Sequence, residues 1–237
     1  MNTFKKLALG LAVTGLVVAQ ASATVAYNFS AATGNQIGGQ FSLGDVFTVN
    51  SSISVDQLGV IGGSASASSD VAIYSINLSG NTITSSSQVA LKTGITSGSA
   101  SANGDLQSIT PVVLAAGTYL IVANNMGASG VSDYNPVYDT ANGPNFPDST
   151  GVNHVTTASS PNITFSALGF FASSGSLPAN VNGFTADTFW TGGGPRYGAG
   201  NFDFAPVPEI GVFGTASAGL LGLIYVGRCG LRKRKVA

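Results

Sequence analysis

The longest polar stretch of the chain, residues 132–154, carries the side chains best suited to hold a cation. Three carboxylates, Asp133, Asp139 and Asp148, stand there among several asparagines. Carboxylate and amide oxygens are the ligands that calcium prefers in proteins, but the spacing matches no EF-hand. A solvated loop between two strands explains the same composition, and we favour that interpretation. Calcium is therefore the one candidate cofactor, at a weak site.

Aromatic side chains near these residues suggest a second chemistry, the binding of sugars. Tyr134 and Tyr138 lie inside the polar stretch, and Trp190 follows it beside Phe184 and Phe189. An exposed aromatic ring can stack on a sugar ring, whereas a buried tryptophan fills the core of a β-sandwich. We favour the core position for Trp190 and keep Trp190, Tyr134 and Tyr138 as candidate ligand contacts.

Catalytic motifs are missing from the sequence. His154 is the only histidine, and no Gly-x-Ser-x-Gly motif accompanies it. A Ser–His–Asp triad needs a placed nucleophile, and a histidine zinc site needs further histidines or cysteines. Glycosidases use two positioned carboxyl groups, and no glutamate precedes Glu209. The sequence therefore predicts a protein that is not an enzyme.

Short apolar runs between turn residues predict the elements that hold these side chains. Ser79-Gly80-Asn81 separates two such runs and predicts a hairpin. The alternation of apolar residues shifts by one position between Val55 and Leu58, which predicts a bulge. The continuous apolar run 119–123 predicts a central strand, and Val89 and Leu91 are expected on one face of their strand. Alternation also places Val71 and Ile73 opposite Ala72, Tyr74 and Ile76.

No segment of residues 24–205 shows a helical period, and glycine-rich turns recur throughout that region. Many short strands of this kind predict an all-β fold, a single β-sandwich of the jelly-roll type. The predicted body holds two cations against nine aspartates, so its net charge is −7. This charge argues against a nucleic-acid partner, since phosphates require lysine and arginine.

The N-terminal residues 1–23 have the pattern of a secretory signal peptide. Two lysines precede an apolar stretch, and the small residues Ala21 and Ala23 stand where signal peptidase cleaves. Cleavage after Ala23 makes Thr24 the first residue of the mature chain. An uncleaved membrane anchor is the alternative. Signal peptidase is therefore an expected partner.

The C-terminal residues 206–237 have the pattern of a membrane segment. Residues 210–227 carry no charge, and a helix over them would be about 27 Å long, close to the thickness of the hydrocarbon core. The basic stop that follows is expected on the cytoplasmic side. It consists of Arg228, Arg232, Lys233, Arg234 and Lys235. A buried core helix is the alternative.

Val207, Pro208 and Glu209 stand directly before this apolar segment and its basic end, residues 228–237. This arrangement resembles the PEP-CTERM sorting signal of bacterial surface proteins, whose usual motif is V-P-E-P; Ile210 replaces the last proline here. The resemblance implies processing by an exosortase-like membrane enzyme. It also implies export across the inner membrane, transient anchoring, and release to the cell surface or the surroundings.

Residues 39–125 are similar to uncharacterised jelly-roll domains of such surface proteins. With the tail, this similarity leads us to expect an exported surface or extracellular-matrix protein with a structural or adhesive β-sandwich. Exopolysaccharide is its candidate partner. The first alternative is a carbohydrate-binding module that acts on exopolysaccharide, and the second is a secreted hydrolase.

Overall fold

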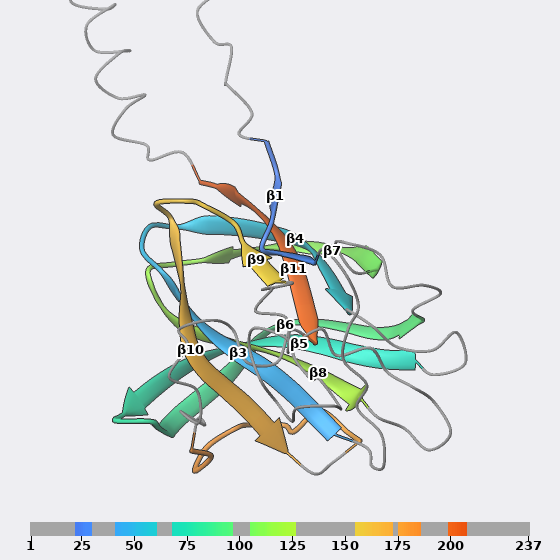
Figure 1. The fold of residues 1–237 in the computed structure, drawn as a ribbon, viewed down its shortest axis with the longest axis vertical. Helices are drawn as coiled ribbons and strands as arrows, with labels where there is room; N and C mark the ends of the chain where they lie inside the picture. Colours follow the sequence, from blue (N-terminus) through green and yellow to red (C-terminus); the bar gives the residue numbers. More distant parts are fainter. Residues whose placement is uncertain are drawn as a thin grey trace, which may run out of the picture. The chain divides into compact units, whose positions relative to one another are not determined.

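A computed structural model describes seven ranges of the chain: 22–29, 41–60, 68–96, 105–126, 155–172, 175–185 and 199–207. Within them every regular element is a β-strand (Figure 1). No helix in these ranges is long and apolar enough to cross a membrane. The predicted signal peptide before residue 22 and the predicted membrane segment 210–227 lie outside the described residues. The all-β prediction is confirmed for the part that is described.

The strands form two main sheets and one short ribbon, and every pairing with a defined register is antiparallel. The four-stranded sheet has the order β1 (Thr24–Val25), β11 (Gly200–Pro206), β4 (Ile53–Val60), β7 (Asp105–Leu114). The five-stranded sheet has the order β10 (Ile163–Ala172), β3 (Phe41–Val49), β8 (Gly117–Met126), β5 (Ser68–Ser79), β6 (Thr82–Thr96). The ribbon pairs β2 (Tyr27–Phe29) with β9 (Val155–Thr157).

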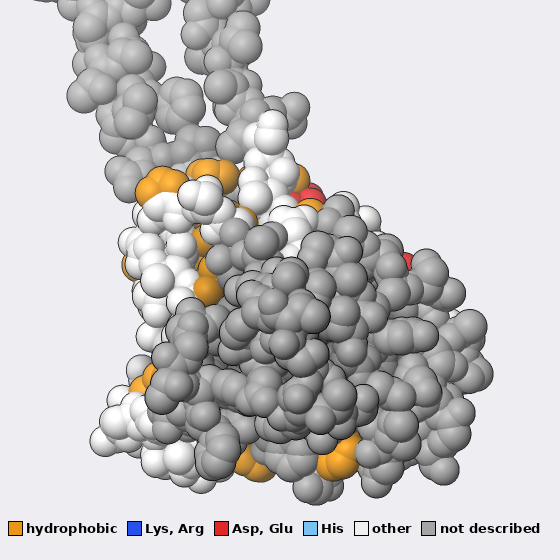
Figure 2. All heavy atoms as spheres, in the orientation of Figure 1, with side chains coloured by type: hydrophobic (Ala, Val, Ile, Leu, Met, Phe, Trp, Pro, Cys, Tyr) orange, Lys and Arg blue, Asp and Glu red, His pale blue; other side chains and the backbone are white. Residues whose placement is uncertain are grey.

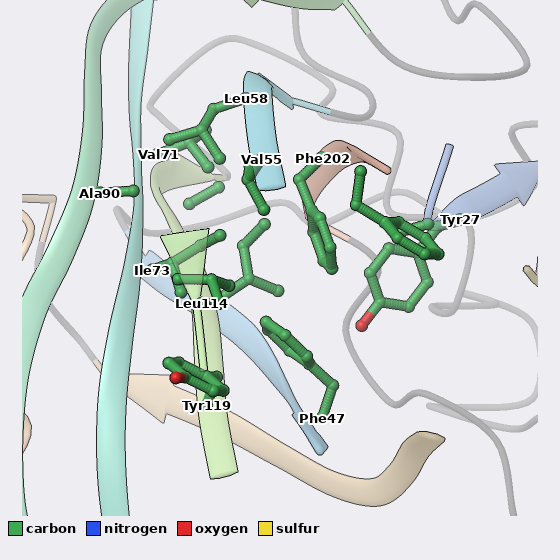
Figure 3. Close-up of a cluster of buried hydrophobic side chains, with 14 of the residues drawn as sticks. Tyr27, Phe47, Val55, Leu58, Val71, Ile73, Ala90, Leu114, Tyr119 and Phe202 are labelled. Carbon is green, nitrogen blue, oxygen red and sulfur yellow. The ribbon is translucent and has the colours of Figure 1, made fainter. Parts of the chain in front are cut away.

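The inner faces of the two sheets share one apolar core, which we term the inner cluster (Figure 3). Phe47 of β3 lies 4.9 Å from Phe202 of β11 between ring centroids, so the contact joins the two sheets. Tyr119 of β8 stacks on the other side of Phe47 at 5.7 Å. Burial of such side chains is the main stabilising term of a two-layer β domain.

The outer face of the five-stranded sheet is also buried. Ala72, Tyr74 and Val122 belong to a second apolar cluster on this face, the outer cluster. Residues 175–185, which we term the strap, cross this face and contribute Val181 to the cluster. Val71 lies in β5, as Ala72 and Tyr74 do, but its side chain belongs to the inner cluster, in agreement with the predicted alternation. A sheet covered on both faces needs apolar residues at consecutive positions.

Three local predictions are confirmed by the strand register. The pairing of β4 with β7 shifts between Val55 and Gln57, where the sequence slip predicted a bulge. The hairpin between β5 and β6 turns at Gly80, whose φ of 59° suits glycine. β8 lies third of five in its sheet, a central position.

One local prediction is wrong. Val89 packs against the inner cluster together with the adjacent Ala90, whereas Leu91 is 44% exposed. The β5–β6 register shifts between Ile73 and Tyr74, so one extra residue enters β6 at this point. The bulge turns two consecutive side chains inward and sends Leu91 to the outer face.

The first and the last strand of the sandwich, β1 and β11, pair with each other. Thr24 of β1 lies opposite Phe204 of β11. Next to this pair, the Asn201 side chain accepts a hydrogen bond from the Tyr27 N–H at 3.0 Å and donates one to the Tyr27 carbonyl at 2.8 Å. Both side chains are fully buried. The N-terminal segment is therefore an integral part of the fold.

The chain divides into two compact units, Met1–Ala205 and Pro206–Ala237. Apart from Pro206, the last residue of β11, and Val207, all described residues belong to the first unit.

Candidate functional site

Most residues that the sequence singled out lie outside the described ranges. They are Asp133, Asp139 and Asp148 of the candidate calcium site; Tyr134, Tyr138 and Trp190; His154; Ala21; Pro208 and Glu209; and the basic stop 228–237. Ala23, Thr24 and Val207 are described. Phe184, expected beside Trp190, packs on Phe170 of the outer cluster with ring centroids 5.0 Å apart.

The described residues form a polar pocket of about 540 Å³ on the outer face of the five-stranded sheet. Its floor comes from β5, β6 and β8, and its roof is residues 175–179 of the strap. The floor residues are Ser68, Asp70, Gln88, Leu91, Thr93, Asn124 and Asn125. A pocket of this size lies in the range of small-molecule sites.

The roof is fixed to the sheet by hydrogen bonds from side chains of the strands. The Tyr74 hydroxyl donates to the Pro178 carbonyl at 2.7 Å, and the Ser42 hydroxyl donates to the Ser176 carbonyl at 3.2 Å. Farther along the strap, the Val181 N–H donates to the Ser86 hydroxyl at 2.9 Å. Burial raises the pKa of Tyr74, against the smaller opposing effect of a hydrogen bond with the Gln88 side chain, so the Tyr74 hydroxyl stays protonated well above neutral pH. The pocket is thus formed in advance of any ligand.

Asp70 and Asn124 make the polar centre of the floor. The Asp70 carboxylate accepts the Gly94 N–H at 2.9 Å and the Asn124 amide at 3.4 Å. The Asn124 side-chain oxygen accepts the Asp70 N–H at 2.6 Å. These mutual bonds fix the orientation of both groups, and Asn124 itself is buried. The arrangement holds a carboxylate in a defined direction.

The backbone is irregular around this centre. Gly94 and Asn125 both have positive φ, 69° and 60°. The Asn125 amide donates to the Ser68 carbonyl at 2.9 Å, which holds this left-handed residue in place. The β5–β6 register also shifts between Ser69 and Val71, at Asp70. Bulges and left-handed residues gather near functional sites, where they redirect side chains.

The charge of the pocket is negative. Asp70 is its only charged lining residue among those described. Lys92, the one lysine or arginine of the described ranges, donates to the Ser108 carbonyl of β7 at 3.3 Å and does not line the pocket. Figure 2 likewise shows small red areas and no blue on the described surface of its face. An anionic ligand would therefore be repelled by Asp70, and the described residues that line the pocket offer no compensating cation.

A second acidic position lies on the four-stranded sheet. Burial, and then the charge of Asp56, raise the pKa of Asp203. Burial likewise raises the pKa of Tyr27 well above its ordinary value. The described residues contain no group of three or more potential metal ligands. Asp56 and Asp203 therefore give no basis for a metal centre.

Sequence reasoning missed the pocket, since its lining comes from four separate segments of the chain. Two signals for it were present. Asn124-Asn125 ends an otherwise apolar strand, and Gly94 interrupts β6. Both mark backbone positions that tolerate a left-handed conformation. No known protein family, curated protein or solved structure significantly matches this chain.

Proposed function

We propose that the chain is an exported protein of the cell surface or extracellular matrix, with a structural or adhesive β-sandwich that is not catalytic. Signal peptidase removes residues 1–23, and an exosortase-like membrane enzyme processes the C-terminal segment 206–237. The membrane is involved during sorting, and the mature protein stays at the surface or is released near exopolysaccharide.

The observation that carries this proposal is where the strands begin and end. β1 starts at Thr24, immediately after the expected signal cleavage, and β11 ends at Pro206, before Glu209 of the sorting motif. Residues 1–23 and the residues after Pro208 could be removed without cutting a strand of the body. This is the organisation expected of a domain that stays folded after processing at both ends.

We infer a jelly roll as the finer architecture. If β2, β9 and β10 are set aside and the other eight strands are numbered in chain order, the sheets read 1-8-3-6 and 2-7-4-5. The antiparallel pairs 1-8, 2-7, 3-6 and 4-5 are those of one long hairpin rolled into two sheets. β10 then extends the five-stranded sheet beside β3.

Intact-mass spectrometry of membrane, surface and secreted fractions from the native host tests the proposal. We expect a chain that begins at Thr24 and ends near Pro208. A chain in the membrane fraction that retains 228–237 would overturn the processing step and leave a single-pass anchored domain.

A carbohydrate-binding module is the second candidate, and the polar pocket favours it. Hydroxyl, amide and carboxylate groups line a volume of about 540 Å³ there, and converging polar groups of this kind fix the orientation of a ligand in small-molecule sites. Retention of exopolysaccharide by the immobilised protein tests this candidate. Retention that Trp190→Ala abolishes would locate the site at Trp190 instead.

A further inference from the structure

We propose that the pocket between the strap and strands β5, β6 and β8 binds a neutral or amino-bearing sugar unit and excludes uronic acids. The inference rests on the glycan-binding candidate above, to which it adds a site and a ligand charge. Three features of the pocket carry it: its shape, its hydrogen-bonding groups and its single charge.

The shape of the pocket suits one or two sugar rings. The pocket is open to solvent, and its volume of about 540 Å³ lies within the range of about 300–1,000 Å³ that sites for small ligands span. Leu91, 44% exposed on the floor, and Pro178 in the roof offer apolar contacts. The C–H groups of a sugar ring need such contacts beside the groups that bind its hydroxyls.

The hydrogen-bonding groups suit hydroxyl ligands, which both donate and accept. Asp70 can accept from a hydroxyl or ammonium group, and its bonds to Gly94 and Asn124 hold it in place beforehand. Thr93 and Gln88 are exposed on the same floor and offer a hydroxyl and an amide. Fixed partners lower the entropy that is lost when a ligand binds.

The charge separates three classes of sugar. An amino sugar places an ammonium group near Asp70, a neutral sugar donates a hydroxyl to it, and a uronate places a second carboxylate there. Like charges at close range repel, and the described lining contains no cation to offset the repulsion. The expected order of binding is amino sugar, then neutral sugar, then uronate.

The test uses exopolysaccharide of the native host, separated by ion exchange into cationic, neutral and acidic fractions, and the mature protein immobilised on a support. Ala179→Trp fills the pocket from an exposed position of the roof. Ala116→Trp is the matched control, exposed in the β7–β8 connection, eight residues from Asn124 and so about 27 Å along the strand.

We expect the neutral or cationic fraction to be retained, and Ala179→Trp to weaken retention at least tenfold while Ala116→Trp leaves it unchanged. Asp70→Asn should weaken retention of the cationic fraction about tenfold, and that of the neutral fraction less, since a charged hydrogen bond is the stronger. Circular dichroism and thermal unfolding of each variant check that it is folded.

Each other outcome is decisive. Equal retention by wild type and a folded Ala179→Trp would show that glycan binds elsewhere, which overturns the pocket and leaves the glycan-binding candidate standing. Retention of the acidic fraction as strongly as the neutral or cationic fraction, or alone, would overturn the ligand class. No retention of any fraction would overturn the glycan-binding candidate and the pocket together, while the mass-spectrometric test of export is unaffected.

Discussion

The two sheets of the sandwich differ in whether an apolar cluster covers their outer face. In the five-stranded sheet, β5 buries residues toward the inner and outer clusters alternately. In the four-stranded sheet, the described residues form no second apolar cluster, and the edge strand β7 is partly or fully exposed except at Leu114, with Val113 62% exposed. The difference teaches that the pocket forms on the sheet whose outer face is covered, since a roof is needed to form one. The predictions below test this contrast.

Replacing one glycine in each sheet by alanine should give the largest difference in stability between the two sheets. A Cβ on Gly44 of β3 would collide with the Ile121 carbonyl and lie 3.1 Å from Val122 Cα, both backbone atoms of β8. We expect Gly44→Ala to cost about 4 kcal/mol or more or to prevent folding, since a buried sheet cannot move aside. Denaturant unfolding measures this.

The counterpart in the four-stranded sheet is Gly59→Ala. Its Cβ would lie 2.9 Å from the Leu106 Cδ2 atom and 3.0 Å from the Asp105 carbonyl, near the edge strand β7. We expect a loss of about 1–2 kcal/mol, because a partly exposed leucine and an edge strand can shift. Equal losses at Gly44 and Gly59 would refute the contrast between the sheets.

The four-stranded sheet should depend next on Asn201. Replacement by alanine leaves the buried Tyr27 N–H and carbonyl without their partner. We expect a loss of about 3 kcal/mol, because each unsatisfied buried group costs about 1–3 kcal/mol. Asn182→Ala is the control, an exposed asparagine that bonds Ser86 and should change stability by less than about 0.5 kcal/mol. A stable Asn201→Ala protein would show that these two bonds are not needed to hold Tyr27 in the fold.

The roof of the pocket should respond to Tyr74→Phe. The variant loses the hydrogen bond to the Pro178 carbonyl, worth about 1 kcal/mol. Tyr119→Phe removes a comparable bond to the Ala115 carbonyl, at 2.8 Å in a turn, and serves as control. Amide hydrogen exchange should accelerate in residues 175–185 only for Tyr74→Phe. Unchanged exchange there would mean that the outer cluster alone holds the strap.

The smallest effect concerns pH. The pKa of Asp203 is raised in the folded state by burial and by Asp56. Below the ordinary carboxyl pKa both states are protonated; as pH rises through the raised pKa, the folded state loses stability relative to the unfolded chain. Asp203→Asn should therefore stabilise the protein at pH 7, by no more than about 0.5 kcal/mol, and not at pH 3. A destabilised variant at pH 7 would reverse the assigned sign.

The strands and turns could be predicted from the sequence because their signals are local. Alternation of Val71 and Ile73 with Ala72 and Tyr74 follows from the pleat of a single strand, and the bulge near Asp56 follows from a one-residue slip. The prediction that Leu91 shares a face with Val89 is wrong because of the bulge at Val89. This bulge does not interrupt the alternation of apolar residues in the sequence, so nothing there indicates it.

The pocket could not be predicted, since no local signal joins its parts. Asp70 and Asn124 are 54 residues apart in the sequence and bond to each other because β5 pairs with β8. The strap, which completes the pocket, comes from a third region of the chain. A polar residue at the end of a strand has the same pattern whether it lines a pocket or faces solvent. Only the pairing of distant strands distinguishes the two.

The meeting of β1 and β11 has a consequence for the timing of folding. In a chain that crosses the membrane N-terminus first, Thr24 emerges early, while its partner Phe204 emerges nearly last. The four-stranded sheet therefore cannot close until almost the whole body has been translocated, and long-range pairings of this kind form slowly. Until then one edge of β4 lacks its β11 neighbour and stays open to pairing with a strand of another chain.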